Sequence, residues 1–320
     1  MTTVYFLLTI DTEEDNAWNL DFRPHTDVTV ENIQHLPPFQ QFCNEIGLRP
    51  TYLIDYPVAV DQTASAILRQ LFKEGQCEIG THVHPWCNPP YTEERNHRNS
   101  YLNNLPPELQ YDKLRVLTET IEERIGTRPV SYRAGRYGFD HSTVPVLEAL
   151  NYVVDSSVVP LRNNKNPDEP SFTKVSLLPY HLNRKNVCQP GDSPIVEIPI
   201  TVDFTRKIPG WLKQAYPTLP DIGIRRILRI LFGIEMAWLR PSYASLAAMQ
   251  RLSEVVIASG VPILNMMFHS SELMPGGSPY NKTSEDMEQF LAKIKSLIAY
   301  LSERYALRFI TLKEVPALDL

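Results

Sequence analysis

The chain has 320 residues, of which 21% are charged and 43% are hydrophobic, and its formal net charge at neutral pH is −6. This composition is typical of a globular protein, and the length suits one large α/β domain or two ordinary domains. Because the overall charge is acidic, we expect neither a nucleic acid nor an anionic membrane as a partner.

Targeting and membrane-spanning segments are not predicted. The apolar stretch at 4–10 follows three uncharged residues and runs directly into acidic ones, which is not typical of a signal peptide. No apolar run approaches the ~20 residues that a membrane span requires. The four cysteines form no C-x-x-C pair, which argues against a zinc ribbon and against a disulfide scaffold. We therefore expect a cytoplasmic protein, and the sequence leaves its oligomeric state open.

Strands and helices are predicted to alternate through the first half of the chain. The run at 4–10 is apolar throughout, which indicates a strand buried on both faces. A helix is predicted to begin near Pro37 and Pro38 and to end before Gly47. Further strands are predicted at 50–54, 77–81, 130–133 and 152–155, and further helices at 61–73, 107–125 and 142–150.

The alternation continues in the second half, with strands at 195–202, 262–268 and 308–312, a helix at 242–259, and a long helix that Ser284 is expected to cap. Seven or eight strand–helix units predict one irregular (β/α) barrel that spans residues 1–320 as a single domain. Irregular insertions are predicted at about 160–194 and 205–240. The second insertion contains a candidate helix at 222–232 with apolar and basic residues. Its role could be that of a lid, an oligomer contact or a covering helix, and the covering helix is favoured.

Two histidines stand at the end of the third predicted strand, in the stretch C-E-I-G-T-H-V-H-P-W-C-N-P-P. His82 and His84 are two residues apart, so both imidazoles project from the same face of an extended backbone. Neutral imidazole suits transition metals such as Zn, Fe, Co and Ni. An isolated pair of this kind is more often a plain polar strand end, so a metal site requires a carboxylate from elsewhere in the chain.

A cluster of acids follows the first predicted strand, in the sequence T-I-D-T-E-E-D. Four carboxylates in five residues repel one another unless a cation or an arginine compensates, so they form either a solvated loop or a cation site. In a (β/α) barrel the carboxyl ends of the strands face the active site. One acid from this cluster would complete a two-histidine, one-carboxylate set with open positions, which suits hydrolysis.

Three further strand ends carry polar side chains, namely Arg133, Asp155 and His269. His269 stands at the end of the most apolar strand, where an imidazole without a hydrogen-bond partner is costly. The pKa of a histidine in such surroundings can be tuned so that the ring acts as an acid near neutral pH. Each residue alone also has a structural interpretation. Together with Asp11 and the histidine pair, however, they predict one catalytic site at the carboxyl ends of the strands.

Candidate substrate-binding residues lie in the turns next to these positions. Trp86, Arg136 and Tyr137 are the residues we predict to contact the substrate. Trp86 and Tyr137, together with Tyr91 and Tyr280, could stack on sugar rings, and simple packing is the alternative.

The ordered motifs T-I-D-T-E-E-D, G-T-H-V-H, R-A-G-R-Y-G, V-V-D-S-S and F-H-S-S cover most of the chain and resemble those of the polysaccharide deacetylase family, the NodB-homology carbohydrate esterases. The resemblance is closest to the branch with D-T-E, H-x-H-P-W and R-A-G-R-Y-G motifs. It implies an irregular (β/α) barrel that removes acetyl groups from sugars with one divalent metal ion. Zinc is the first expectation for the metal, and Co, Ni, Fe and Mn are the alternatives.

The resemblance also implies roles for single residues. Asp11 would be the general base, His269 the general acid, and His82 and His84 would bind the metal with an acid, either Glu13 or Asp15. Arg133 would act on Asp11, and Asp155 on His269.

Two departures from the family pattern affect the metal ligands. The family spaces its two histidines four apart, whereas position 86 is a tryptophan here, so His84 can be a ligand only if the loop bends differently. The adjacent aspartate pair of the family is replaced by the spread acids. We predict Glu13 over Asp15 as the ligand because Glu13 shares the strand face of Asp11.

The sequence therefore predicts a metal-dependent hydrolase that removes an acyl group, foremost N-acetyl, from a sugar or polysaccharide precursor. The alternatives are a metal-dependent hydrolase of a non-sugar C–N bond, and a catalytically silent carbohydrate-binding protein.

Overall fold

The computed structural model describes residues 1–19, 21–219 and 221–318. Residue 220 of the predicted insertion and residues 319–320 of the predicted domain lie outside the described residues. Within them, a single large sheet organises the molecule, and its strands run in the order β10-β1-β2-β3-β4-β5-β7-β6, with β11 also paired to β1.

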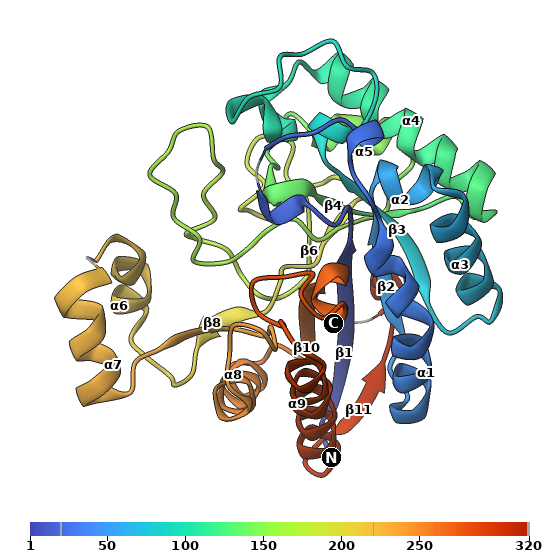
Figure 1. Cartoon of the computed structure of the whole chain (residues 1–320). Helices are drawn as coiled ribbons and strands as arrows, with labels where there is room; N and C mark the ends of the chain where they lie inside the picture. The colour runs from blue at the N-terminus through green and yellow to red at the C-terminus, as the bar shows by residue number, and fades with distance from the viewer. Residues whose placement is uncertain (20, 220, 319–320) are drawn as a thin grey trace.

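The sheet curls into an incomplete barrel (Figure 1). Every pairing in it is parallel except the one between β6 and β7. The strands are β1 (Thr3–Thr12), β2 (Pro50–Ile54), β3 (Glu78–Val83), β4 (Ser131–Ala134), β5 (Val154–Asp155), β6 (Tyr180–His181), β7 (Val196–Glu197), β10 (Ile263–His269) and β11 (Ala306–Phe309).

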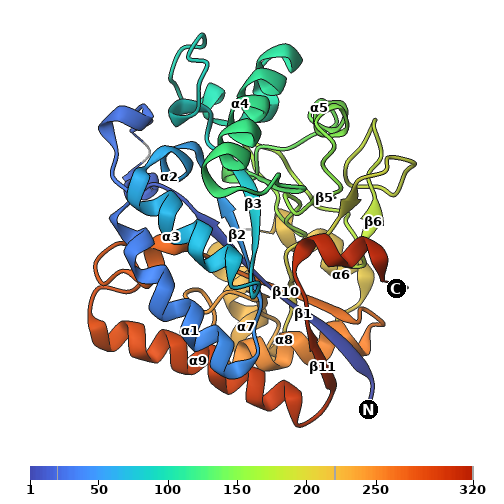
Figure 2. The ribbon, with the colours of Figure 1, turned by 90° about the vertical axis from the view of Figure 1, so that its right-hand side faces the viewer.

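The helices that follow the strands cover the outside of the sheet (Figure 2). The apolar side chains of β1 are buried on both faces, because one face meets these helices and the other faces the barrel interior. The helices are α1 (Leu36–Ile46), α2 (Tyr56–Val60), α3 (Gln62–Lys73), α4 (Pro107–Ile125), α5 (Val144–Ala149), α8 (Leu246–Ala258) and α9 (Ser284–Ser302).

Helix α1 begins next to Pro37 and Pro38 and ends at Gly47, whose φ of 78° is left-handed, so the prediction for this helix is confirmed. The cap predicted for α9 is wrong. Thr283 has an extended backbone and its hydroxyl accepts the N–H of Asp286, which makes Thr283 the N-cap and Ser284 the first helical residue.

The strand predicted at 195–202 is divided. After β7 the chain leaves the large sheet at Pro199, which cannot donate a ladder hydrogen bond. It then enters β8 (Val202–Phe204), which pairs antiparallel with β9 (Met236–Trp238) in a separate two-stranded sheet.

This two-stranded sheet carries the segment 205–235, which we call the protrusion because it stands away from the barrel in Figure 1. It contains α6 (Gly210–Ala215), a π-helical turn (Asp221–Arg225) and α7 (Arg226–Phe232). No residue of α7 is fully buried, and Leu228 packs against a small separate cluster of buried residues, so the role predicted for this helix stays open. The segment 160–194 consists of loops and turns around β6.

All four cysteines are free thiols. Among the described residues, no helix combines the length and the apolar character that crossing a bilayer would require.

Candidate active site

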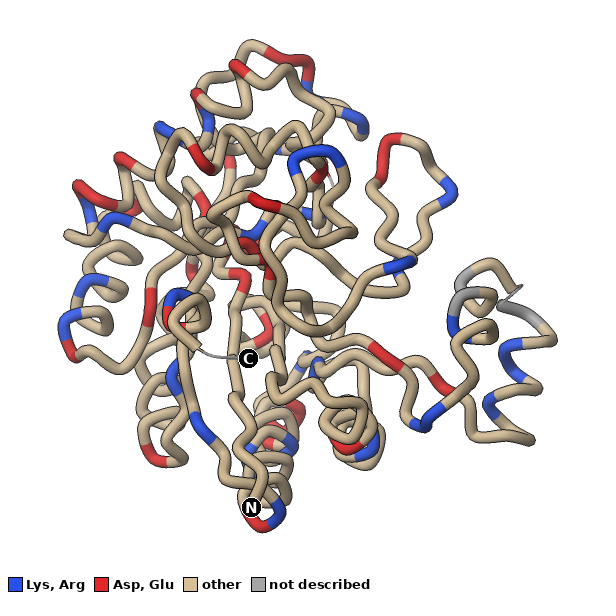
Figure 3. The backbone as a smooth tube through the Cα atoms, turned by 180° about the vertical axis from the view of Figure 1, so that it is seen from behind, with Lys and Arg blue, Asp and Glu red and all other residues tan. Residues whose placement is uncertain are grey.

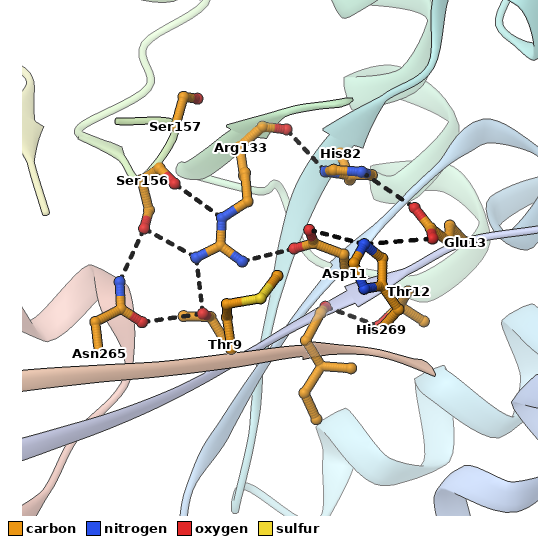
Figure 4. A network of polar contacts seen from close by, with 12 residues as sticks. Thr9, Asp11, Thr12, Glu13, His82, Arg133, Ser156, Ser157, Asn265 and His269 are labelled. Atoms are coloured by element: carbon orange, nitrogen blue, oxygen red, sulfur yellow. Dashed lines mark hydrogen bonds and ion pairs between the residues drawn. The ribbon is translucent and has the colours of Figure 1, made fainter. Parts of the chain in front are cut away.

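Strand register brings the predicted catalytic residues to one edge of the sheet. Asp11 in β1 lies directly beside His269 in β10, and His82 in β3 lies beside Arg133 in β4. Because these strands are parallel, their carboxyl ends meet at the same edge. Figure 4 shows the side chains of Asp11, Glu13, His82 and His269 converging there.

Three side chains form a possible metal site. The Glu13 Oε2 atom lies 3.4 Å from His82 Nε2 and 3.3 Å from His84 Nε2, and the two Nε2 atoms are 3.1 Å apart. All three residues are buried. The backbone at His84 is extended (φ −102°, ψ 109°), so its ring stays on the same side as that of His82, although β3 ends at Val83.

Asp15, the alternative carboxylate, is engaged elsewhere. Its carboxylate accepts the backbone N–H groups of Glu31 and Asn32 at 2.8 and 3.0 Å and the side-chain amide of Asn32 at 2.6 Å. It therefore stabilises the turn that leads into α1, while Glu13 is the acid that the structure places with the two histidines.

The Nδ1 atom of each of these two histidines has a partner that fixes the orientation of the ring. His82 Nδ1 lies 3.1 Å from the carbonyl oxygen of Arg133, which can only accept, so Nδ1 carries the proton. His84 Nδ1 lies 3.0 Å from a carboxylate oxygen of Glu14. In the neutral rings, both Nε2 lone pairs then point at one another across 3.1 Å, an arrangement that repels unless a cation lies between them.

The spacing of the three ligand atoms fits a transition metal. Zinc bonds to nitrogen and oxygen of about 2.0–2.1 Å in a tetrahedron place neighbouring ligand atoms about 3.3 Å apart. The separations between Glu13, His82 and His84 match this spacing. The two-nitrogen, one-oxygen donor set suits Zn, Co, Ni and Fe and does not select one of them.

Glu14 supports His84 from behind, although the sequence analysis gave it no role of its own. Its other oxygen accepts the indole N–H of Trp86 at 3.0 Å, and the Trp86 ring stacks on His84 at 4.2 Å between centroids. Burial raises the pKa of Glu14, but the adjacent His84 and a hydrogen bond with Asp55 outweigh burial and hold the pKa well below its ordinary value. Glu14 is therefore an anion that orients the His84 ring.

Asp11 is held in its ionised form by Arg133. The Arg133 guanidinium donates to Asp11 Oδ1 at 2.6 Å, and its remaining donors reach Thr9 and Ser156 (Figure 4). Burial raises the pKa of Asp11, yet the charges of Arg133, His82 and His269 outweigh it and lower the pKa to about 2. Asp11 can therefore accept a proton throughout the neutral range.

His269 faces both acids of the site. Its Nε2 atom lies 3.8 Å from Asp11 Oδ2 and 3.7 Å from Glu13 Oε1. Its Nδ1 atom lies 3.2 Å from Glu272 Oε1 and 2.9 Å from Arg240, and Glu272 and Arg240 form a buried ion pair at 2.5 Å. The sequence analysis missed both. Glu272 stands three residues after His269, and this spacing could have indicated a contact with the imidazole. Arg240 lies at the end of the predicted insertion, where no sequence pattern indicates a contact with His269.

Asp155 is not the partner of His269 that the family resemblance implied. Ser156 turns its hydroxyl into the barrel, toward Arg133 and Asn265, so its neighbours Asp155 and Ser157 point to the other face of the chain. There the Ser157 hydroxyl donates to Asp155 at 2.6 Å. Burial raises the pKa of Asp155, and the adjacent Glu197 shares a hydrogen bond with it. Asp155 thus belongs to a buried acid pair behind Arg133.

The site opens into a cavity of about 210 Å³. Its lining includes the three predicted substrate-binding residues, and also Trp18, which was not predicted; the full set is Asp11, Glu13, Ala17, Trp18, His82, His84, Trp86, Arg136, Tyr137 and His269. Trp86 is only 5% exposed, so its main contact is with His84. Arg136 and Tyr137 line the cavity and have strained φ values of 55° and 61°. The Arg136 guanidinium donates to the hydroxyls of Ser100 and Tyr101 in the neighbouring loop.

No protein-family model matches the chain, and no curated protein matches it. Among solved structures, a candidate polysaccharide deacetylase of Mycobacterium smegmatis superposes with a TM-score of 0.56 at 15% identity, over 99% of this chain and 90% of that chain. The 4-alpha-glucanotransferase of Thermococcus litoralis gives 0.53 at 13% identity, over 99% of this chain and 40% of that chain.

The Puue allantoinase gives a TM-score of 0.50 at 16% identity, over 98% of this chain and 89% of that chain. At such low identities, similarity of structure shows a shared fold only. The predicted fold class is confirmed: the chain has the irregular (β/α) barrel fold of the NodB-like deacetylases.

Proposed function

We propose that the protein is a metal-dependent hydrolase that removes an acyl group, foremost N-acetyl, from a sugar or polysaccharide precursor. The observation that carries the proposal is the convergence of Glu13, His82 and His84 on a cavity that Asp11 and His269 also line. One pocket thus holds a metal-ligand set, an ionised carboxylate and an imidazole, which are the groups that amide hydrolysis requires.

In this proposal Glu13, His82 and His84 hold one divalent metal ion, zinc in the first instance. Such an ion supplies Lewis acidity toward a carbonyl oxygen and lowers the pKa of water. The protein holds the two imidazoles in place through the Arg133 carbonyl and the Glu14 carboxylate, so the ligands are oriented before any substrate binds.

Asp11 is the proposed general base, because its ionised carboxylate faces the cavity and Arg133 keeps it fixed. His269 is the proposed general acid, which protonates the departing amine. Its Nε2 atom points into the site at 3.8 Å from Asp11, and its Nδ1 atom is held by Glu272 and Arg240. These residues therefore lie on one side of the cavity with a short path between base and acid.

Two observations support a sugar as the substrate. The motifs resemble those of the polysaccharide deacetylases. The cavity is also lined by the rings of Trp18, Trp86 and Tyr137, which can pack against the apolar faces of a sugar.

The test combines metal content with acetate release. Purified protein would be analysed for bound metal and assayed against a panel of N-acetylated sugars. We expect about one metal ion for each chain, lost in the double variant His82→Ala with His84→Ala. Asp11→Asn and His269→Ala should keep the metal but lose on the order of 10²- to 10⁴-fold in rate.

His141→Ala is the matched control, because His141 is 60% exposed and lies outside the cavity. It should retain both metal and activity. Comparing Glu13→Ala with Asp15→Ala identifies the carboxylate ligand: a Glu13 variant that retains its metal would contradict the ligand assignment. Full activity without any metal would refute the proposed reaction.

A second candidate is hydrolysis of a non-sugar C–N bond. The Puue allantoinase, whose name denotes a non-sugar substrate, has a TM-score of 0.50 to this chain, so the fold does not choose between the two substrate classes. Including ureides in the substrate panel distinguishes them. A protein that binds sugars without metal and releases nothing from any substrate would instead be a silent carbohydrate-binding protein.

A further inference from the structure

The charge of the chain is unevenly distributed. The net charge of the whole chain is −6, yet the protrusion at 205–235 contains six basic and only two acidic residues. Figure 3 shows the basic positions along the protrusion at the edge of the molecule. The expectation of no anionic membrane partner was drawn from the total charge and therefore overlooked this local positive potential.

The protrusion also exposes large apolar side chains. Within α7, Ile227, Ile230 and Leu231 are 51%, 62% and 70% exposed, and their spacing of three and four residues places them on one face of the helix. The other large exposed apolar residues of the protrusion are Trp211, Ile224 and Phe232. Half of the large apolar side chains exposed on the described residues are thus gathered on this short part of the chain.

An arginine-rich cavity lies beside this apolar face. It has a volume of about 350 Å³ and is lined by Arg225, Arg226 and Arg229, together with Tyr216, Glu235 and Met236. Arginine guanidinium groups recognise phosphate by paired hydrogen bonds, and a cavity of this kind accommodates an anionic headgroup. An apolar helix face next to an arginine-lined cavity is complementary to a bilayer surface, which has an apolar interior below charged headgroups.

The protrusion has its own small core, which holds this surface in place. Leu161, Phe204, Tyr216 and Ile234 form a buried cluster separate from the core of the barrel, and Leu228 of α7 packs against it. The side of α7 that carries Leu228 is therefore anchored, while Ile227, Ile230 and Leu231 remain without a cover.

We propose that the protrusion docks the protein on the surface of a bilayer that contains anionic phospholipids. Exposed isoleucine, leucine, phenylalanine and tryptophan side chains would enter the interface, and the arginines would bind phosphate headgroups. Charge argues against a second copy of this chain as the occupant, because a symmetric contact would bring the basic residues of two protrusions together. The proposal is independent of the proposed hydrolase function.

The test is flotation of the purified full-length protein with vesicles of phosphatidylcholine, with and without one third phosphatidylglycerol. We expect binding to the anionic vesicles only, weakened by high salt because surface charges are screened. Arg226→Glu with Arg229→Glu should weaken binding by about 25-fold or more, since each arginine near an anionic surface contributes roughly a factor of five.

The apolar contact is tested separately. Ile230→Glu with Leu231→Glu should also lose vesicle binding, and it should fold normally because neither residue is buried. Trp211 is 71% exposed, so its fluorescence should shift to the blue when vesicles are added, and Trp211→Phe should remove that shift.

Arg251→Glu with Lys295→Glu is the matched control. It makes the same change of charge at exposed positions of α8 and α9 and should leave vesicle binding intact. Binding that falls equally in the control and in the arginine variant would refute the docking surface, as would an absence of binding to anionic vesicles. A dimer that dissociates in the Ile230→Glu and Leu231→Glu variant, with no vesicle binding by the wild type, would assign the face to a second copy.

Discussion

At the scale of single residues, each acid of the cluster after β1 has its own partners. Glu13 faces both histidine Nε2 atoms, Glu14 holds His84 Nδ1, and Asp11 pairs with Arg133. Asp15 stabilises a turn and leaves the site. Asp11 and Glu14 are ionised beside Arg133 and His84, whereas burial raises the pKa of Glu13, so the neighbouring carboxylates need not all carry a charge in the metal-free protein.

Glu14→Gln tests the support of the metal ligand. The amide keeps the size of the side chain but removes the negative charge beside His84 Nδ1, so we expect metal affinity to fall by about 10- to 100-fold. Competition with a chelator measures this change. Asp15→Asn, at the acid that does not contact the histidines, serves as the control, and equal losses in both variants would contradict the role of Glu14.

Glu13 should make the metal-free protein less stable as pH rises. Burial raises the pKa of Glu13 to about 7 from the ordinary value of 4.5 for a glutamate. The protonated Glu13 side chain favours the folded protein, so its contribution to the free energy of unfolding is fully present below pH 4.5. This contribution is lost as pH rises through about 7, because the buried carboxyl group must then ionise in the folded state as well. The total loss is about 3 kcal/mol.

Urea unfolding of chelator-treated protein at pH 5 and pH 7 measures this effect. Glu13→Gln cannot ionise, so its free energy of unfolding should fall less over the same interval. A wild type and a Glu13→Gln variant with the same pH dependence would show that the folded protein does not raise the pKa of Glu13. Bound metal should suppress the effect in the wild type, because a metal ion favours the ionised carboxylate.

At the scale of elements, the turn after β4 packs directly on the end of β3. A Cβ atom at Gly135 would overlap the ring of His84 and the carbonyl oxygen of Val83. The glycine is therefore required because two strand ends approach more closely than any side chain permits.

Gly135→Ala should displace His84 and lower metal content well below one ion for each chain, with a loss of thermal stability as well. Gly210→Ala is the control, because no atom lies within 4 Å of its added Cβ. Elemental analysis and thermal unfolding would be measured on both variants. Normal metal content in Gly135→Ala would show that the turn can yield without moving the histidine.

The chain returning from the protrusion completes the surroundings of His269. The N–H of Leu239 donates to Thr201, and the carbonyl of Leu239 accepts the N–H of Met267 in β10. These bonds attach the end of β9 to the barrel and bring Arg240 beside His269. An insertion in the sequence thus supplies a residue of the candidate site.

At the scale of the whole molecule, the protrusion should be removable without loss of the barrel. Replacing residues 206–234 by Asn-Gly would close the hairpin between Thr205 and Glu235, whose backbones are already hydrogen-bonded at 2.9 Å. We expect one bound metal ion and unchanged hydrolysis, but no vesicle binding.

The deletion should reduce stability by at most about 6 kcal/mol, since it exposes Leu161 and Phe204, worth about 1.5–3 kcal/mol each when buried. Circular dichroism and urea unfolding check this expectation. A shortened protein that fails to bind metal would show that the protrusion also supports the site, and would assign Arg240 a larger structural role.

The sequence by itself determined the barrel and identified most residues of the candidate site, because both predictions follow from local patterns. Buried strands such as 4–10 and amphipathic helices such as 107–125 have clear periodicities, and parallel strands place their carboxyl ends at one edge. Asp11, Glu13, His82, His84, Arg133 and His269 were found in this way.

Only the tertiary structure decided which of these side chains meet. Asp155 was assigned to His269 by resemblance, but strand alternation turns it to the other face, and Glu272 and Arg240 contact the imidazole instead. Pairing across more than two hundred residues, as between β1 and β10, depends on register and packing that no local pattern encodes. The exposure of α7 was likewise hidden, because an amphipathic helix has the same sequence pattern whether its apolar face is covered or free.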